Sequence, residues 1–114
     1  MSRVEALKTS WFHILLSLAD RELHGTAIME EVLHRTDGAV RLWPGKLYGS
    51  LRDLAARDLI REVDAPDDAP TEGGTRRFYA LTPDGRRALR DEVERMAAFV
   101  QVARARGVAG REPA

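Results

Sequence analysis

The hydrophobic positions in the first part of the chain recur with the spacing of an α-helix. Residues 5–19 carry one apolar stripe, formed by Leu7, Trp11, Ile14, Leu15 and Leu18. Residues 20–25 interrupt this pattern, and a second helix is predicted over residues 26–34. The inward positions of the second helix are Ile28, Met29, Val32 and Leu33.

A third helix is predicted after a turn. Gly38 suits the left-handed conformation that commonly ends a helix, so the second helix is expected to end at residues 36–38. Pro44 suits the first turn of the next helix, because the N–H group that proline lacks has no helical partner there. Leu47, Leu51 and Leu54 supply the core-facing stripe of this helix, which is predicted to end near residues 57–58.

The period of the pattern then changes from helix to strand. Residues 59–63 and 77–81 predict two short strands, and the Asp-, Pro- and Gly-rich residues between them predict a hairpin with a long tip. Thr82 and Pro83 suit the cap and the first position of a last helix, predicted over residues 83–106.

The order of these elements is that of a winged helix-turn-helix, in which the third helix enters the major groove of DNA. The sequence thus predicts a mainly α fold with a small β-hairpin. We expect a DNA-binding domain over residues 1–82, a dimerisation helix over 83–106 and a disordered tail over 107–114.

The third helix presents a polar face opposite its leucines. This face comprises Gly45, Lys46, Gly49, Arg52, Asp53 and Ala56, with Tyr48 on its flank. Each glycine inside a helix costs about 1 kcal/mol relative to alanine, a cost that close approach to another surface can offset. Lys46 and Arg52 suit contacts to phosphate or guanine, and the Tyr48 hydroxyl suits phosphate. The alternative is an ordinary solvated helix face.

The end of the hairpin tip is basic. Arg76 and Arg77 are expected to reach a minor groove or a run of phosphates beside the third helix. The same loop also carries four acidic residues: Asp64, Asp67, Asp68 and Glu72. Their negative charges repel DNA, so only the distal side of the hairpin is expected to touch it.

The last helix carries a second apolar pattern. Its positions alternate spacings of four and three residues, as in a coiled-coil seam: Leu89, Val93, Met96, Val100 and Ala103. A helix over residues 83–106 is roughly 36 Å long at 1.5 Å per residue, longer than so small a domain covers. We therefore expect the seam to pack against a second copy of the chain in a two-fold dimer. The alternative is a helix that folds back onto its own core.

Composition and charge narrow the class of protein. The 114 residues fit one domain, and 44% hydrophobic with 32% charged residues exclude a wholly disordered chain. The chain has no cysteine, which excludes disulfide scaffolds, zinc fingers and a cysteine nucleophile. With no apolar run of about 18 residues and no signal-peptide pattern, a cytoplasmic protein without membrane contact is expected. Eighteen basic residues balance eighteen acidic ones, so any DNA contact must come from a local patch.

Catalytic and metal-binding patterns are weak. His13, His24 and His34 lack the spacing of a metal site. Gly45-Lys46 is not a phosphate-binding loop, because Val40 replaces its first glycine and Leu47 its Ser or Thr. We therefore predict no enzyme, no metal and no cofactor.

Three segments carry a family resemblance, in order and at the family's spacing. They are His-Gly-Thr-Ala-Ile at 24–28, Pro-Gly-Lys-Leu-Tyr-Gly-Ser-Leu at 44–51, and Arg-Phe-Tyr-Ala-Leu-Thr-Pro-Asp-Gly-Arg-Arg-Ala-Leu at 77–89. With them, residues 6–96 resemble the PadR family of transcriptional regulators, in the short form with a single C-terminal dimerisation helix. The resemblance implies a homodimeric repressor that binds an inverted-repeat operator.

Three positions depart from the family pattern. Thr26 stands where the family often has Tyr, so a phosphate contact from this position is expected to be weaker. Asp58 replaces a glycine before the first strand, and aspartate tolerates the left-handed conformation better than most residues. Trp43 stands where a small capping residue is common.

The resemblance also implies release from DNA by a small aromatic or multidrug-like ligand. Trp11, Phe12, Met96 and Phe99 are the candidates to line a pocket between the first and last helices. The alternative for each is core or dimer packing. Two further functions stay open at this point: a winged-helix dimer that serves as a protein-interaction module, or one that carries a ligand, without DNA binding.

Overall fold

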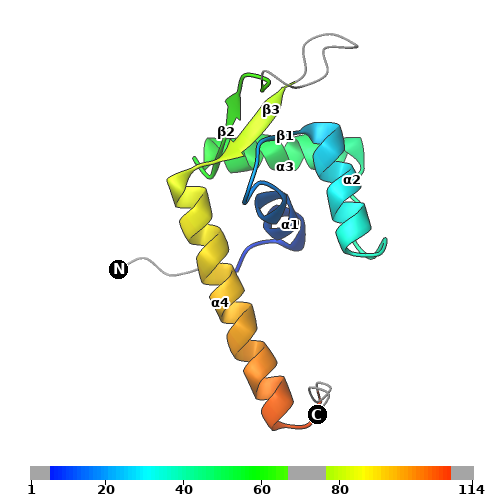
Figure 1. Cartoon of the computed structure of the whole chain (residues 1–114), viewed down its shortest axis with the longest axis vertical. Coiled ribbons are helices and arrows are strands. Elements are labelled where there is room, and N and C mark those ends of the chain that lie inside the picture. The colour runs from blue at the N-terminus through cyan, green and yellow to red at the C-terminus, as the bar shows by residue number, and fades with distance from the viewer. Residues whose placement is uncertain (1–5, 67–76, 109–114) are drawn as a thin grey trace.

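Three helices enclose the hydrophobic core, and a longer fourth helix extends away from it (Figure 1). The computed structural model describes residues 6–66 and 77–108. Along these residues the elements follow in this order: α1 (Thr9–Ser17), β1 (Leu23–His24), α2 (Gly25–Arg35), α3 (Pro44–Ala56), β2 (Ile60–Val63), β3 (Phe78–Leu81) and α4 (Pro83–Ala105). The predicted fold class, a mainly helical winged helix-turn-helix with a long last helix, is confirmed.

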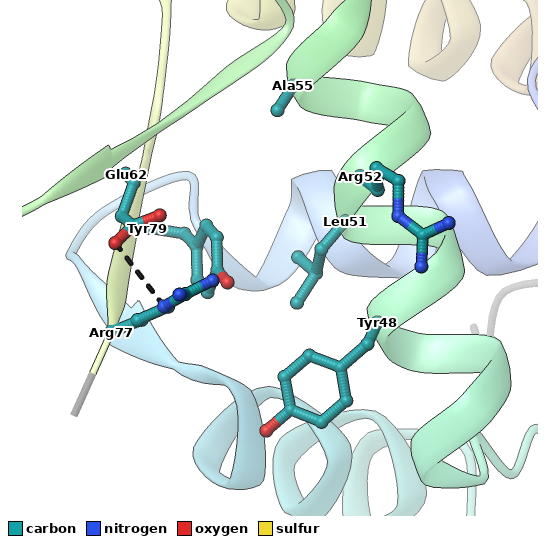
Figure 2. A pocket seen from close by; sticks show the side chains of 7 residues that line it. All are labelled: Tyr48, Leu51, Arg52, Ala55, Glu62, Arg77 and Tyr79. Atoms are coloured by element: carbon teal, nitrogen blue, oxygen red, sulfur yellow. Dashed lines mark ion pairs between the residues drawn. The ribbon is translucent and has the colours of Figure 1, made fainter.

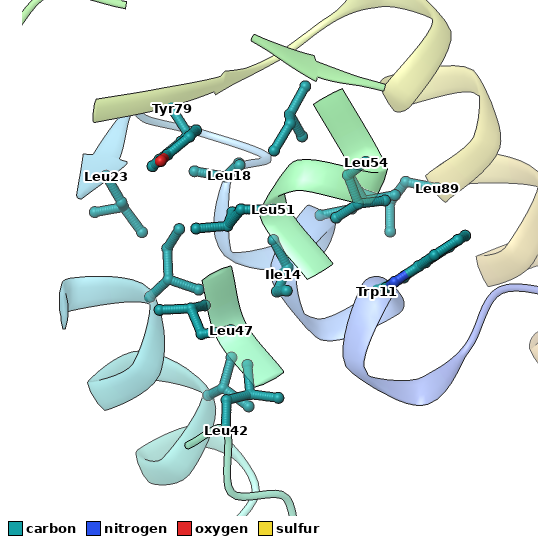
Figure 3. Packing of buried hydrophobic residues seen from close by; sticks show 14 residues of the cluster. Trp11, Ile14, Leu18, Leu23, Leu42, Leu47, Leu51, Leu54, Tyr79 and Leu89 are labelled. Carbon is teal, nitrogen blue, oxygen red and sulfur yellow. The ribbon is translucent and has the colours of Figure 1, made fainter. Parts of the chain in front are cut away.

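The core forms where the predicted helical stripes converge (Figure 3). α1 packs against α2, α3 and α4. The side chains of Ile14, Ile28, Leu47 and Leu54 are completely buried. Leu89 from α4 also joins this core, next to the indole of Trp11 in Figure 3. Burial of one stripe on each helix therefore determines which face of each helix meets solvent.

The sheet has one strand more than the sequence predicted. β3 lies between β1 and β2, antiparallel to both, with Leu23 opposite Tyr79 and Ile60 opposite Leu81. The predicted hairpin is therefore confirmed as β2–β3, although residues 67–76 of its tip lie outside the described residues. Residues 20–25 interrupt the helices as predicted, but the sequence analysis did not anticipate the two-residue strand within them. Two residues are too few for an alternation signal, and pairing with β3 makes them a strand.

Side chains cap the starts of α2 and α4, whereas α1 and α3 begin without a side-chain cap. α1 begins at Thr9 and not at residue 5, since residues 6–8 are not helical. α2 is capped by His24, whose Nδ1 accepts the Ala27 N–H at 3.2 Å. Asp58 has a φ of 60° and Gly38 a φ of 82°, so both adopt the left-handed conformation that the sequence analysis assigned to them.

The start of α4 is locked to the start of the hairpin. The Thr82 hydroxyl accepts the Gly85 N–H at 2.9 Å and donates to the Asp58 carbonyl at 2.6 Å. The Thr82 N–H donates to the Leu59 carbonyl at 3.2 Å. A Cβ atom on Gly85 would lie 1.9 Å from that same carbonyl oxygen. Only glycine therefore fits where α4 crosses the chain before β2.

Replacing this glycine should destabilise the fold, and a second glycine provides a matched control. Gly85→Ala should lower the free energy of unfolding by about 1–3 kcal/mol, because its methyl group overlaps a backbone carbonyl. Gly49→Ala should raise it by about 0.5–1 kcal/mol, because a Cβ there meets nothing within 4 Å and stiffens a helix. Urea unfolding at equal protein concentration measures both. Equal stability of the two variants would contradict this packing.

Candidate nucleic-acid interface

The polar face of α3 is open to solvent. Leu47, Leu51 and Leu54 are buried, whereas the predicted contact residues Gly45, Lys46 and Arg52 are exposed and Gly49 is half-buried. A Cβ on Gly45 or Gly49 would meet nothing within 4 Å. No contact among the described residues therefore requires glycine at these two positions. Without side chains there, the helix backbone between Lys46 and Arg52 is accessible to close approach by another molecule.

Tyr48 connects α3 to the start of α2. Its side chain is 47% exposed, and its ring lies over Gly25, where a Cβ would come within 2.8 Å of the hydroxyl oxygen. The glycine after His24 therefore admits the Tyr48 ring. Thr26, the next residue of α2, is exposed. The sequence motifs at α2 and α3 thus meet at one contact, which sequence spacing did not reveal.

A cleft of about 320 Å³ separates α3 from the β2–β3 hairpin, which we call the wing (Figure 2). Its lining combines cations, phenols and one carboxylate: Tyr48, Leu51, Arg52 and Ala55 from α3, Glu62 from β2, and Arg77 and Tyr79 at β3. Arg77 extends from the wing into the cleft, whereas Arg52 lines its α3 side with its guanidinium pointing away from Arg77 (Figure 2). The cleft thus offers positive charge from two separate elements.

Glu62 places an acid among these cations. Its Oε1 lies 3.6 Å from Nε of Arg77, and both side chains are largely exposed. Burial raises the pKa of the Tyr79 phenol, and the charge of Glu62 raises it further against the opposing effect of Arg77. The Tyr79 hydroxyl therefore stays neutral at physiological pH. The sequence analysis missed Glu62, because only the register that sets it opposite Tyr79 brings it to the cleft.

The predicted wing residues are only partly described. Arg77 is exposed and paired with Glu62, whereas Arg76 lies outside the described residues. Of the acidic residues that were expected to repel DNA, Asp64 is exposed, and Asp67, Asp68 and Glu72 lie outside the described residues. The basic wing beyond Arg77 therefore stays a prediction.

The predicted seam on α4 divides into a buried and an exposed part. Leu89 is 6% exposed and belongs to the core of its own chain. Val93 and Val100 are 44% and 46% exposed, and Met96 and Ala103 are half-buried. Phe99 and Val102, outside the predicted seam, add further exposed apolar surface to the same helix. The accessible part of the seam therefore begins at Val93.

Glu92 holds this helix to the segment before α1. Its carboxylate is 4% exposed and accepts two bonds from Arg95, at 3.0 Å from Nε and 2.6 Å from Nη2. These bonds, with another from the Leu7 backbone, keep the pKa of Glu92 below its ordinary value despite burial. The sequence pattern did not distinguish Glu92 from a solvated glutamate, because its partners come from tertiary contact and from one helical turn.

The candidate ligand pocket residues have unequal surroundings. Trp11 is packed in the core, with Lys8 Nζ 4.8 Å and the Arg57 guanidinium 4.9 Å from its ring centre. Phe12 and Met96 are half-buried, and Phe99 is exposed beneath the guanidinium of Arg95. The packing of Trp11 in the core agrees with core packing, the alternative to a role in a ligand pocket.

Residues 6–66 and 77–108 contain no group of three or more His, Cys, Asp or Glu side chains that could hold a metal ion. His13 instead contacts Arg35, whose Nη2 lies 3.3 Å from its Nδ1 and 2.9 Å from its carbonyl oxygen. Burial, and then the charge of Arg35, lower the pKa of His13. None of the helices in this part of the chain is long and apolar enough to cross a membrane.

The helix order, the open α3 face and the adjacent hairpin define a winged helix-turn-helix protein. A PadR family transcription regulator from Clostridium difficile has a similar structure, with a TM-score of 0.71 and 21% identity over 86% of this chain and 97% of that one. PadR of Bacillus subtilis, in complex with operator DNA, gives a TM-score of 0.64 and 20% identity over 75% of this chain and 47% of that one.

Sequence comparison identifies the family. The model of the transcriptional regulator PadR-like family matches residues 14–91. Transcriptional regulator Rv3488 of Mycobacterium tuberculosis is 35% identical over 70% of this chain and 68% of its own length. A 37.1 kDa protein of transposon TN4556 from Streptomyces fradiae is 40% identical over 74% of this chain, which spans 22% of that protein.

The chain belongs to the PadR-like family of transcriptional regulators, as its three motifs predicted. It is therefore a DNA-binding transcription regulator and not an enzyme.

Proposed function

We propose that the chain is a homodimeric repressor that binds an inverted-repeat operator with α3 of each copy in a major groove. The observation that carries this proposal is the open face of α3, where two unfilled glycines lie beside Lys46 and Arg52. The proposed DNA contacts are Thr26, Gly45, Lys46, Tyr48, Gly49, Arg52, Arg76 and Arg77. Lys46 and Arg52 supply charge-assisted contacts to phosphate or guanine.

The cleft between α3 and the wing suits a DNA backbone. Arg77 extends into it from the wing, so a phosphate between helix and wing meets this cation, while Arg52 adds charge on the outer side of α3. Tyr48 adds an exposed hydroxyl donor at one end of the same cleft. The chain carries no net charge, so its attraction to DNA must come from a local group of cations such as this one.

Dimerisation is proposed through α4. The exposed side chains of Val93 and Val100 share one side of this helix, and Phe99 lies toward the same side, so they form an apolar surface that the core of the chain does not cover. A second copy would bury this surface and set the two α3 helices about one DNA turn apart.

Release by a small aromatic or multidrug-like ligand is the third element of the proposal. Phe12, Met96 and Phe99 lie on α1 and α4, which pack together beside the apolar surface proposed for dimerisation. A ligand held there would alter how α4 meets its partner, and thereby the spacing of the two α3 helices. We place this regulator in the cytoplasm, where its operator is.

DNA binding is tested by fluorescence anisotropy with the duplex upstream of the chain's own gene and a scrambled duplex of equal length. Preference for the native duplex, with affinity that falls steeply between about 50 and 200 mM salt, supports the proposal. No binding at the lower salt would favour a protein-interaction module or a ligand carrier. A dimer that binds aromatic compounds without a DNA response would identify the carrier.

Lys46→Ala should weaken binding to native and scrambled duplexes alike. Loss of one phosphate contact should also lower the salt slope by about one. Arg90→Ala, which removes an exposed cation from α4, is the matched control and should leave both quantities unchanged. Unchanged affinity and slope in Lys46→Ala would remove Lys46 from the interface.

Glu62→Gln should strengthen DNA binding, because it removes the one acid that lines the cleft among the described residues and releases Arg77. We expect several-fold tighter binding to scrambled DNA and a salt slope steeper by up to about one. Glu94→Gln, a matched loss of one exposed carboxylate on α4, should change neither. Weaker binding by Glu62→Gln would mean that the carboxylate itself contacts the DNA.

Val100→Glu should convert the dimer into a monomer, because it places a charge within the exposed apolar surface of α4. Light scattering should give twice 12.7 kDa for the unaltered chain and 12.7 kDa for the variant. Gln101→Glu adds the same charge at an exposed position outside the seam and should remain dimeric. A monomeric unaltered chain in concentrated solution would refute dimerisation through α4.

A further inference from the structure

The position of Trp43 is not explained by its contacts within the chain. It is the N-cap residue of α3, and it makes no capping hydrogen bond. Its indole is 64% exposed, more than any other aromatic side chain of the described residues. An N-cap position favours a small side chain with an oxygen acceptor. The indole also remains in water, so the chain gains none of the stability that burial of such a large apolar ring would provide. Both features indicate that the indole serves a contact outside this chain.

The surroundings of Trp43 hold the indole in a defined place. The guanidinium of Arg41 lies 5.4 Å from the centre of its ring. Trp43 also lines a small pocket of about 200 Å³, together with Arg41, Glu30 and the apolar residues Met29, Leu33 and Leu42. The indole therefore has charged and apolar neighbours within the chain, and much of its ring surface stays exposed.

The position of Trp43 on α3 specifies what it can meet. Pro44, Gly45 and Lys46 follow it directly, so Trp43 stands at the N-terminal end of the helix whose open face is proposed to enter the major groove. Residues at the N-terminus of a recognition helix contact base edges. In the major groove the one apolar group on a base edge is the C5-methyl of thymine. An indole offers a large apolar surface and only a single N–H donor, which suits this methyl group better than a polar edge.

We infer that Trp43 is a specificity-determining residue that selects a thymine in each half-site by apolar contact with its C5-methyl group. The inference rests on the proposed entry of α3 into the major groove. Lys46 and Arg52 would then supply affinity for the groove, while Trp43 and the base-edge contacts supply sequence preference. The guanidinium of Arg41 lies over the indole, so in this arrangement it would place a positive charge near the DNA that Trp43 contacts.

The test removes the methyl group from the DNA and the indole from the protein separately. A duplex selected by the unaltered chain from a randomised pool is synthesised with deoxyuridine in place of each thymine in turn. At one position of each half-site, a single substitution should weaken binding by about fourfold, the value of one buried methyl group. Trp43→Ala should bind the thymine and deoxyuridine duplexes equally. Lys46→Ala should bind both more weakly and keep the fourfold ratio.

Three outcomes would overturn the inference. They are insensitivity of the unaltered chain to every deoxyuridine, an unchanged ratio in Trp43→Ala, and equal loss of affinity for selected and scrambled duplexes in Trp43→Ala. Failure to select any duplex would instead refute the proposed function itself, so the two failures are distinguishable. Because Trp43 is exposed, Trp43→Ala should unfold at the same urea concentration as the unaltered chain.

Emission from the indole gives a second readout that does not depend on affinity. The chain has two tryptophans, of which Trp11 is buried and Trp43 is exposed. Saturation with the selected duplex should change the emission of the unaltered chain, and this change should be absent in Trp43→Phe. A full change in Trp43→Phe would assign the signal to Trp11 and count against the contact.

Discussion

Burial of the leucines of α3 is the constraint on which the arrangement of this protein depends. Leu47, Leu51 and Leu54 each gain about 1.5–3 kcal/mol when removed from water, and the three share one side of the helix. Once that side faces the core, the helix has no freedom to rotate. Gly45, Lys46 and Arg52 are then directed outward by the geometry of the helix alone, without any contact that holds them there.

Two glycines transmit this arrangement to the neighbouring elements. Gly25 admits the ring of Tyr48, so α3 meets the start of α2 more closely than a side chain would permit. Gly85 admits the carbonyl of Leu59, so α4 begins against the chain that enters the wing. The Tyr48 side chain thereby holds α3 against α2, and the Leu59 backbone holds α4 against the chain that enters the wing.

The net charge of the chain does not describe the charges around the cleft beside α3. Acidic and basic residues balance over the whole chain, yet the cleft beside α3 receives two arginines and one glutamate from three different elements. The carboxylate beside Arg77 lowers the attraction that this cation exerts on DNA at a distance.

The sequence alone determined the helices, the hairpin and the polar face of α3, because a periodicity of 3.6 or 2 residues reports which side of an element is buried. Its motifs also identified the family. Only the tertiary structure decided the strand at residues 23–24, the place of Glu62 in the cleft and the burial of Glu92. Each depends on a partner from elsewhere in the chain: β3 for the strand, the register with Tyr79 for Glu62, the Leu7 backbone for Glu92. A local pattern carries no record of such partners, because they meet only when the chain folds.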